Sequence, residues 1–401
     1  MASEKKWLFT LFSVTFVSLL LFLSALSSFS ASFAFSSHKF FPSAVRYGVE
    51  YPPAFAYYIS GGRWQKDQIF RLLLAVYHPR NRYLLHLDPE ASNAERRRLA
   101  EAVRAVPAIQ AFRNVDVIGK PDPLTYLGST NIAATLRAAA ILLRVDSNWD
   151  WFITLSALDY PLLTQDDLSH VFSTVRRDLN FIDHTSDLGW KEHQRVQPIV
   201  VDPGIYLARR TQIFEATQKR KTPDLFKIFT GSPWVTLNRA FLEFCILGWD
   251  NLPRAVLMYF TNAMLPQEGY FHSVVCNSPE FQNTTVNSDL RFVVWDNPPK
   301  MEPHHLNVRD YDLMVQSGAA FARQFNKDDR VLDMVDDKIL MRDSYRAAPG
   351  AWCTGKRSWW KDPCSKWGDV NIMKPGPQAE RFGEVIMGLI DDWRSQPRPC
   401  K

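Results

Sequence analysis

A single carboxylate, Glu268, stands two residues after a proline in the stretch 265–276, which reads LPQEGYFHSVVC. The apolar residues that follow predict a helix, so Glu268 is expected in its first turn. Backbone N–H groups and the positive end of the helix dipole would hold a carboxylate there in its ionised form. Such a group can serve as a helix cap or as a general base that takes a proton from a substrate. The stretch alone leaves both roles open.

Expected strands and helices alternate regularly in the first half of the chain, and these elements must position the carboxylate. Short runs of β-branched and aromatic residues predict strands, and apolar residues spaced three and four apart predict helices. Strands that alternate with helices predict an α/β domain with a mostly parallel sheet and helices on its faces. The expected strands are 54–60, 82–88, 115–119 and a fourth within 149–162 that runs into a loop at Asp159, and the expected helices are 67–77, 92–106 and 129–145.

Four residues of interest fall where these strands are expected to end, namely Gly61, Gly62, Asp88 and Asp159. Ligands in open α/β sheets bind beyond the carboxyl ends of the strands. Glycines at such a position allow the backbone to approach a ligand closely. The spacing therefore predicts a ligand site at this edge of the sheet.

The second half of the chain is less regular. We expect an insertion with short strands over 184–206, then a strand and a helix begun by Asn238 within 230–248. Two helices broken at Pro266 and a strand at 291–297 should follow, before an irregular tail. No internal repeat is evident, so we expect one catalytic domain.

Motifs of several other enzyme classes are missing from the sequence. G-x-x-x-x-G-K-[ST], H-E-x-x-H and G-x-S-x-G do not occur, and no G-x-G-x-x-G follows the first strand. These absences disfavour P-loop, zincin, hydrolase and dinucleotide-binding proteins. The one D-x-D, Asp310-Tyr311-Asp312, lies after the last clear core strand, and we interpret it as helix cap and surface charge. A net charge of +5 without a basic run gives no sign of nucleic-acid binding.

The N-terminus predicts entry into the secretory pathway. Lys5 and Lys6 precede an uncharged apolar run, residues 7–26, which is long enough to span a bilayer. We predict an uncleaved signal anchor with a cytosolic tail at 1–6, a stem at 27–50 and a lumenal catalytic domain at 51–401. The alternative is a signal peptide cleaved near the small residues of ALSS.

The cysteines and a sequon fit a lumenal domain. Cys353 and Cys364 flank a short turn and are candidates for a local disulfide, and the absence of C-x-x-C disfavours a zinc site. The chain has five cysteines, so at least one thiol stays unpaired within it. Asn283 begins the sequon Asn-Thr-Thr and is a candidate for N-glycosylation.

Six stretches occur in order along the chain, namely AYYISGG, YLLHLD, WDWFITLSALDYPL, FTGSPWVTLNR, LPQEGYFHSVV and SGAAFARQF. Together they resemble the family 14 glycosyltransferases of the core-2/I-branching type, and most of all their plant β-glucuronosyltransferase-like branch. The resemblance covers roughly residues 50–340. It implies a GT-A-like, Rossmann-type fold in a single-pass type II Golgi membrane enzyme. It also implies inverting transfer from a UDP-sugar without a metal, in the plant branch from UDP-glucuronate to the β-linked galactan of arabinogalactan proteins.

The resemblance assigns the reacting groups by their place in these motifs. Glu268 matches the family's catalytic carboxylate, the base for an acceptor hydroxyl. Without a metal, cationic side chains must offset the charge of the leaving UDP. Arg323 in FARQF matches the family's diphosphate cation. Lys300 is the nearest basic match for a second one, and His304 and His305 lie nearby as alternatives.

The remaining assignments concern the donor and the acceptor. Asp88 matches an aspartate that meets uracil or ribose, and Tyr126 matches an aromatic of the donor site. Asp159 is expected to bind a sugar hydroxyl or to order its loop. A glucuronate donor requires an Arg or Lys for its carboxylate, which the sequence does not name. Gly61, Gly62 and Arg63 are expected under the nucleotide, and Trp190, Lys191, Gly231, Ser232 and Trp234 are candidates for contacts with the acceptor or donor sugar.

Two other functions remain open from the sequence. An N-acetylglucosaminyl- or xylosyltransferase would share the fold and the same reacting groups. A non-catalytic carbohydrate-binding protein would be expected to lack the base and the diphosphate cation, but Glu268 and Arg323 are both present. The sequence does not indicate an oligomeric state.

Overall fold

The computed structural model describes residues 17–18, 43–206, 212–298, 300, 302–355, 362–396 and 400. The chain divides into two units, Met1–Phe41 and Pro42–Lys401. The predicted anchor at 7–26 lies outside the described residues except for Val17 and Ser18. Within the described part of the chain, no helix is both long and apolar enough to cross a membrane.

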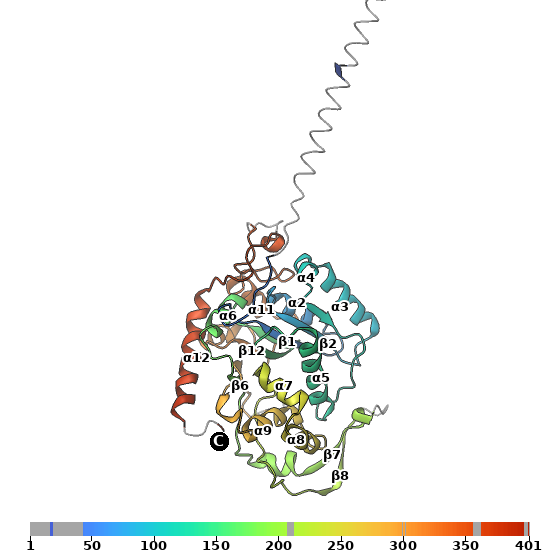
Figure 1. The fold of residues 1–401 in the computed structure, drawn as a ribbon. Helices are drawn as coiled ribbons and strands as arrows, with labels where there is room; N and C mark the ends of the chain where they lie inside the picture. Colours follow the sequence, from blue (N-terminus) through green and yellow to red (C-terminus); the bar gives the residue numbers. More distant parts are fainter. Residues whose placement is uncertain are drawn as a thin grey trace, which may run out of the picture. The chain divides into compact units, whose positions relative to one another are not determined.

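A seven-stranded sheet forms the centre of the second unit (Figure 1). Its strand order is β10-β6-β9-β4-β1-β2-β3. The strands β4, β1, β2 and β3 are parallel to one another, whereas β9 runs antiparallel to β4 and β6. The mostly parallel sheet predicted from the sequence is thereby confirmed. The strands are β1 Phe55–Gly61, β2 Arg82–Leu87, β3 Val115–Val117, β4 Trp151–Ser156, β6 Asn180–Phe181, β9 Thr236–Asn238 and β10 Thr285–Val286.

Helices cover both faces of this sheet, because alternate side chains of a strand point to opposite faces. Tyr57 and Ile59 of β1 belong to one apolar cluster, and Ala56 and Tyr58 belong to the other. In Figure 1 the first group of helices lies above the strands and the second lies below them. The first group is α2 Lys66–Ala75, α3 Asn93–Ala105, α4 Pro107–Phe112 and α6 Gln165–Phe172, and the second is α5 Thr130–Val145, α7 Arg239–Leu247, α8 Leu252–Phe260 and α9 Tyr270–Asn277.

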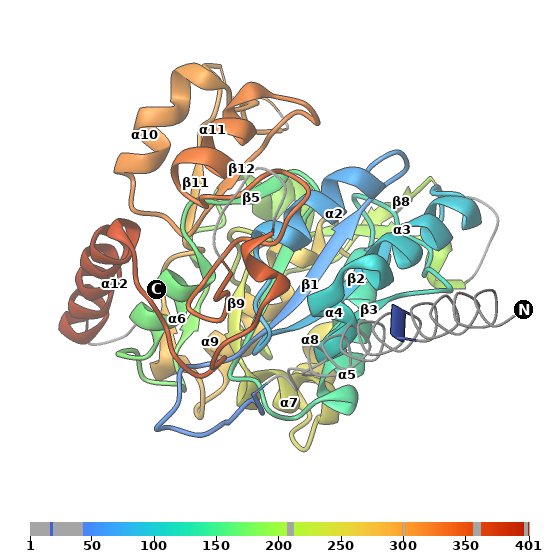
Figure 2. The ribbon, with the colours of Figure 1, turned by 90° about the horizontal axis from the view of Figure 1, so that it is seen from above.

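A second, three-stranded sheet has the order β11-β12-β5 and was not anticipated. The strand expected within 149–162 is β4, but the loop expected at Asp159 is a strand as well, because the chain turns after β4 and β5 (Asp159–Pro161) joins this second sheet. The expected strand at 291–297 is limited to β11, Arg291–Val293, and pairs with β12, Phe321–Arg323. Figure 2 shows these strands beside α10 (Tyr311–Gln316) and α11 (Arg330–Lys338).

Side chains that cap helices account for several of the element boundaries. Ser92 accepts from the backbone of Glu95 and completes a capping box at the start of α3. Asn238 accepts a 2.8 Å hydrogen bond from Phe241 N and begins α7, as the sequence predicted. The insertion after β6 contains a π-helix, Glu192–Val196, and the hairpin of β7 (Pro198–Val201) and β8 (Phe214–Lys219).

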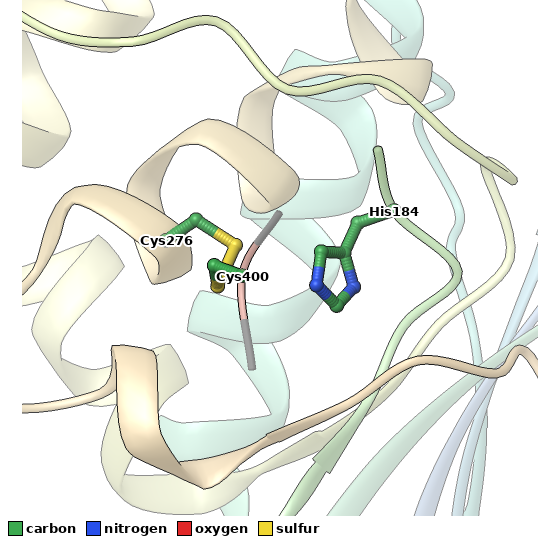
Figure 3. A group of neighbouring side chains, drawn as sticks. All are labelled: His184, Cys276 and Cys400. Atoms are coloured by element: carbon green, nitrogen blue, oxygen red, sulfur yellow. A yellow bond between two sulfur atoms is a disulfide. The ribbon is translucent and has the colours of Figure 1, made fainter. Parts of the chain in front are cut away.

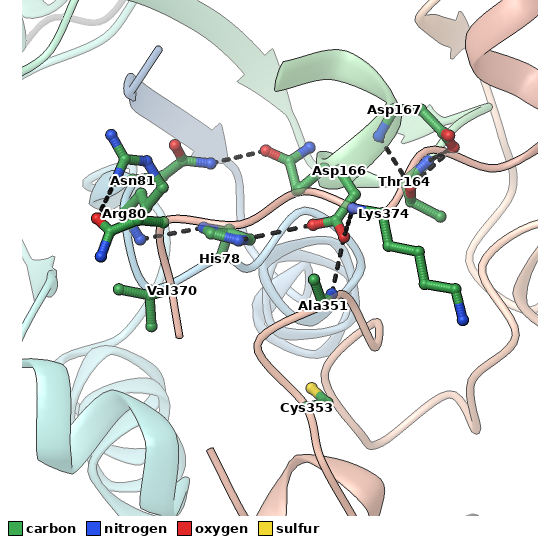
Figure 4. A network of polar contacts seen from close by, with 12 residues as sticks. His78, Arg80, Asn81, Thr164, Asp166, Asp167, Ala351, Cys353, Val370 and Lys374 are labelled. Atoms are coloured by element: carbon green, nitrogen blue, oxygen red, sulfur yellow. Dashed lines mark hydrogen bonds and ion pairs between the residues drawn. The ribbon is translucent and has the colours of Figure 1, made fainter. Parts of the chain in front are cut away.

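The C-terminal segment is held to α6 by buried acids. Asp166 accepts hydrogen bonds from Ala351 N at 2.8 Å and from Lys374 N at 2.9 Å (Figure 4). Its Oδ1 lies 3.6 Å from Nε2 of His78. Burial raises the pKa of Asp166 to about 6 and lowers that of His78 to about 3. This network fixes the irregular tail that leads into α12, Pro377–Ser395.

Candidate active site

Glu268 is the last residue of a 3-10 helix, Pro266–Glu268, and stands two residues before α9. The expectation that it lies in the first turn of α9 is wrong, because Gly269 is the N-cap of that helix. Leu265 adopts a left-handed conformation with φ of 50°, and Glu268 N donates to its carbonyl at 2.9 Å. The tight turn separates the carboxylate from the backbone N–H groups of α9, so another group must stabilise its charge.

Arg195 is that group. Its Nη1 forms an ion pair with Oε2 of Glu268, and the two side chains are 22% and 20% exposed. The guanidinium carbon also lies 4.9 Å from the centre of the Trp190 ring, a cation–π contact. Burial raises the pKa of Glu268, and the charges of Arg195 and Lys191 oppose that rise without cancelling it. A carboxylate with a raised pKa is a stronger base than a free glutamate.

Gly231 brings a second loop against the turn of Glu268. Gly231 N donates to the backbone oxygen of Glu268 at 2.9 Å, and a Cβ at this position would lie 1.8 Å from the Asp183 carbonyl oxygen. Only glycine therefore fits here. Ser232 N donates to Oδ2 of Asp183 at 3.2 Å, and Nε2 of the buried His272 lies 2.9 Å from Ser232 O. The loop is thus fixed on both sides beside the base.

Arg323 occupies the second sheet, where β12 pairs with β5 and sets it opposite Asp159. Its Nη1 donates to Ser156 Oγ at 2.6 Å and to Asp159 Oδ1 at 3.1 Å. Asp159 also accepts from Ser156 N at 2.5 Å, so it orders its own loop, one of its two expected roles. The ring centre of Trp234 lies 4.3 Å from the guanidinium carbon of Arg323 and 5.3 Å from that of Arg291. Two cations therefore share one aromatic ring.

The predicted nucleotide residues meet at the carboxyl ends of β1 and β2. Asp88 N donates to Gly61 O at 2.9 Å, and a Cβ at Gly62 would lie 3.1 Å from Oδ2 of Asp88. Burial raises the pKa of Asp88. Arg63 is exposed, with its guanidinium carbon 4.5 Å from the centre of the Trp64 ring. These contacts bring together Gly61, Gly62 and Asp88, whereas Asp159 lies opposite Arg323 in the second sheet.

Tyr126 lies on a loop that touches the turn of Glu268. Its backbone oxygen accepts from Gln267 Nε2 at 3.2 Å, and Leu265 N donates to Leu127 O at 2.9 Å. Burial and a hydrogen bond to Glu302 raise the pKa of the Tyr126 hydroxyl. Because Glu302 lines a neighbouring pocket, Tyr126 lies between the base and that pocket.

The pocket has a volume of about 350 Å³. One of its lining residues is Gln324, which follows Arg323 in the chain. Lys300 is 73% exposed at this pocket, and its Nζ lies 2.7 Å from Oδ2 of Asp296. His304 Nδ1 approaches the same carboxylate at 3.0 Å. The predicted second cation is therefore next to a pocket, although it is already paired. The lining residues are Asp296, Lys300, Glu302, Pro303, His304, His305 and Gln324.

The potential metal ligands have other structural roles. Asp310 of the D-x-D accepts from Asn307 N at 2.9 Å and completes a capping box, the role inferred from the sequence. Among the described residues, one group of three metal-type side chains gathers, namely His184, Cys276 and Cys400 (Figure 3). The two sulfurs form a disulfide, so they are not available as thiolate ligands.

The remaining cysteines and the glycosylation sequon also lie among the described residues. Cys353 and Cys364 are joined by a disulfide, the pair suggested from the sequence, and Cys245 is a buried thiol. Asn283 is exposed on a short 3-10 helix, Gln282–Thr284, where its side chain is accessible to a glycosyltransferase.

Sequence reasoning missed Arg195, Asp183, His272 and Arg291. Arg195 follows Lys191 by four residues, and this spacing places both side chains on one side of a helical turn. Because Lys191 was already a candidate site residue, the spacing could have identified Arg195 as a second one. Arg291 is one basic residue in an apolar strand and carries no comparable signal. Its place beside Trp234 arises only from the pairing of β11 with β12.

Comparison with known proteins identifies the family. The profile of the Core-2/I-Branching enzyme family matches residues 55–315. The chain belongs to this family. The resemblance inferred from the six sequence motifs is therefore confirmed, and the protein is a glycosyltransferase.

This Core-2/I-branching enzyme has close relatives in Arabidopsis thaliana. It is 47% identical over 420 residues to β-glucuronosyltransferase GlcAT14A, covering 100% of this chain and 94% of that protein. It is 51% identical over 346 residues to β-glucuronosyltransferase GlcAT14B, covering 86% of this chain and 80% of that protein. Xylosyltransferase 1 of Mus musculus is 27% identical over 341 residues, covering 78% of this chain and 33% of that protein.

Proposed function

We propose that the protein is an inverting, metal-independent β-glucuronosyltransferase. It moves glucuronic acid from UDP-glucuronate to the β-linked galactan of arabinogalactan proteins. The names of the Arabidopsis relatives support the donor. The observation that carries the proposal is a partly buried Glu268 with a raised pKa, beside a loop held by Gly231.

Glu268 would act as the general base. An acceptor hydroxyl donates its proton to the carboxylate while its oxygen attacks the anomeric carbon from the face opposite UDP. The charge of Arg195 favours the ionised carboxylate and opposes the effect of burial on its pKa. The raised pKa brings its basicity closer to the working pH, where general-base catalysis is most effective.

Arg323 would offset the charge that develops on the leaving UDP. A guanidinium has five N–H donors, and within the described residues only Nη1 of Arg323 donates to protein groups. The remaining donors are free for phosphate oxygens, and the ring of Trp234 fixes the plane of the group. Lys300 at the rim of the adjoining pocket supplies a second positive charge.

The proposal extends to the setting of the reaction. The apolar run at 7–26 would anchor the enzyme in the Golgi membrane with residues 51–401 in the lumen. The exposed sequon at Asn283 supports a lumenal domain, since glycosylation requires that compartment. Digestion of the full-length protein with a glycosidase tests this, because an Asn283→Gln variant should already run at the deglycosylated mass.

The full-length protein with Glu268→Gln tests the catalytic role. We expect turnover to fall by about 100- to 10,000-fold while UDP affinity is retained. Glu280→Gln is the matched control, because Glu280 is exposed just after α9. Transfer by the Glu268 variant at the wild-type rate would overturn the base assignment. Activity abolished by EDTA and restored by manganese would overturn the metal-independent mechanism.

A xylosyltransferase is the second candidate, because xylosyltransferase 1 of the mouse is a more distant relative. A panel of UDP-sugars with β-galactan oligomers, read by mass spectrometry, separates the two. An added mass of a pentose in place of a uronic acid would favour the second candidate.

A further inference from the structure

Besides Arg63 among the predicted nucleotide residues, five described cationic side chains lie in or beside the site, and four of these five are engaged by protein groups. A paired cation shares its charge and part of its donors with a protein group, whereas an unpaired cation offers its full charge to a substrate carboxylate. The four engaged cations are Arg195 with Glu268, Arg323 with Asp159, Lys300 with Asp296, and Arg291 with the backbone oxygens of Thr154 and Asp289.

Lys191 is the fifth. Its Nζ has no hydrogen-bond or ion-pair partner among the described residues, although the side chain is only partly exposed. It precedes Arg195 by four residues at the start of the same helical turn, so the two side chains leave that turn on one side. Its charge lowers the pKa of both Glu268 and Asp183. Lys191 therefore lies within electrostatic reach of both the base and Asp183, which holds the loop of Gly231.

The chemistry of a uronic acid donor requires a cation at such a place. Its carboxylate is carried by C5, which is joined to the anomeric carbon through the ring oxygen. In an α-linked donor the diphosphate is axial on one face of the ring, whereas the carboxylate is equatorial and projects from the ring edge near the anomeric carbon. Arg323 and Lys300 are assigned to the diphosphate, so the carboxylate is expected to need a further cation near the base.

We infer that Nζ of Lys191 binds the carboxylate of the donor sugar and selects a uronic acid over a neutral hexose. This inference rests on the proposed function and assigns the one contact that the sequence left without a residue. Lys191 is a specificity residue in this scheme, and it takes no part in the proton transfer.

Binding measurements on the full-length protein test the inference with two donors that differ only at C6. UDP-glucuronate carries a carboxylate there, and UDP-glucose carries a hydroxymethyl group. We expect Lys191→Met to weaken binding of UDP-glucuronate by about 10- to 100-fold, the usual effect of losing a charged hydrogen bond. Binding of UDP-glucose and of UDP should change by less than about threefold. Lys191→Arg should recover part of the affinity for UDP-glucuronate, because it restores the charge.

Three results would overturn the inference. Equal weakening of both donors by Lys191→Met would show that the residue supports the site in general. Unchanged binding of UDP-glucuronate would show that the ammonium group does not contact it. Selective loss of UDP-glucuronate in Arg195→Gln, with Lys191→Met unaffected, would assign the carboxylate to Arg195.

The wild-type enzyme separates this inference from the proposed function. If it transfers no glucuronate to any galactan acceptor, the proposed function fails and the inference fails with it. If it transfers glucuronate while Lys191→Met binds both donors alike, the inference alone fails.

Discussion

Replacement of Arg195 by Gln should make the enzyme sensitive to acid without reducing its rate at alkaline pH. Arg195 pairs with Glu268 and favours the ionised carboxylate. Without that charge the pKa of Glu268 rises further, because burial already raises it. Only the deprotonated carboxylate takes a proton from the acceptor. The variant therefore loses activity where the base becomes protonated.

The size of the effect follows from the exposure of the pair. Exposed ion pairs contribute about 0–1 kcal/mol, and breaking a buried pair costs about 3–5 kcal/mol. The two side chains are 22% and 20% exposed, between these limits, so we assign about 1–3 kcal/mol. At a pH below both pKa values this energy corresponds to a loss of kcat/KM of about 5- to 150-fold. Above both values no loss is expected.

The assay is the pH profile of kcat/KM, with saturating acceptor and the UDP-sugar varied. Arg195→Lys is the matched control, because it keeps the charge and should leave the acid limb near its wild-type position. An acid limb that does not move in Arg195→Gln would refute the role of this ion pair. A uniform fall at every pH would show instead that Arg195 acts in substrate binding.

Three further predictions concern the cation, the loop and the disulfide. Arg323→Ala should raise the Kd for UDP by about 10- to 100-fold in a calorimetric titration, and an unchanged Kd would remove Arg323 from the diphosphate site. Gly231→Ala should lower the free energy of unfolding in urea by about 1–3 kcal/mol, because the added Cβ meets the neighbouring backbone. Gly388→Ala is the control and should not lower this free energy, because its Cβ would enter open space. Cys276→Ser removes the disulfide to Cys400, which links residues 124 apart in the sequence, and should lower the free energy of unfolding by up to about 5 kcal/mol. If the variant unfolds at the same urea concentration as the wild type without reductant, the result would argue against this disulfide.

The elements of the first half could be predicted closely because their causes are local. The expected helix at 129–145 is α5, Thr130–Val145, and the expected strand at 82–88 is β2, Arg82–Leu87. Apolar spacing and capping residues act within one or two turns, so they are visible in the sequence. The strand ends carrying Gly61 and Asp88 likewise followed from the alternation, since parallel strands bring their carboxyl ends to one edge.

The predictions that were wrong concern features that depend on contacts between residues far apart in the sequence. The loop expected at Asp159 is a strand instead, because Asp159 pairs with Arg323, 164 residues later, in a separate sheet. No local pattern reports such a pairing. The helix dipole was expected to stabilise Glu268, but the turn at Leu265 leaves the carboxylate outside α9.

The sequence by itself determined the fold class, the family and the identity of the candidate base, since each depends on local spacing or on ordered motifs. Only contacts across the folded chain show which of the described cations are paired with an acid. Arg195 meets Glu268 across 73 residues, and Lys191 lies on the same turn without a partner among the described residues. Whether a charged side chain is paired depends on its neighbours in space. For Arg195 that neighbour comes from a distant part of the chain.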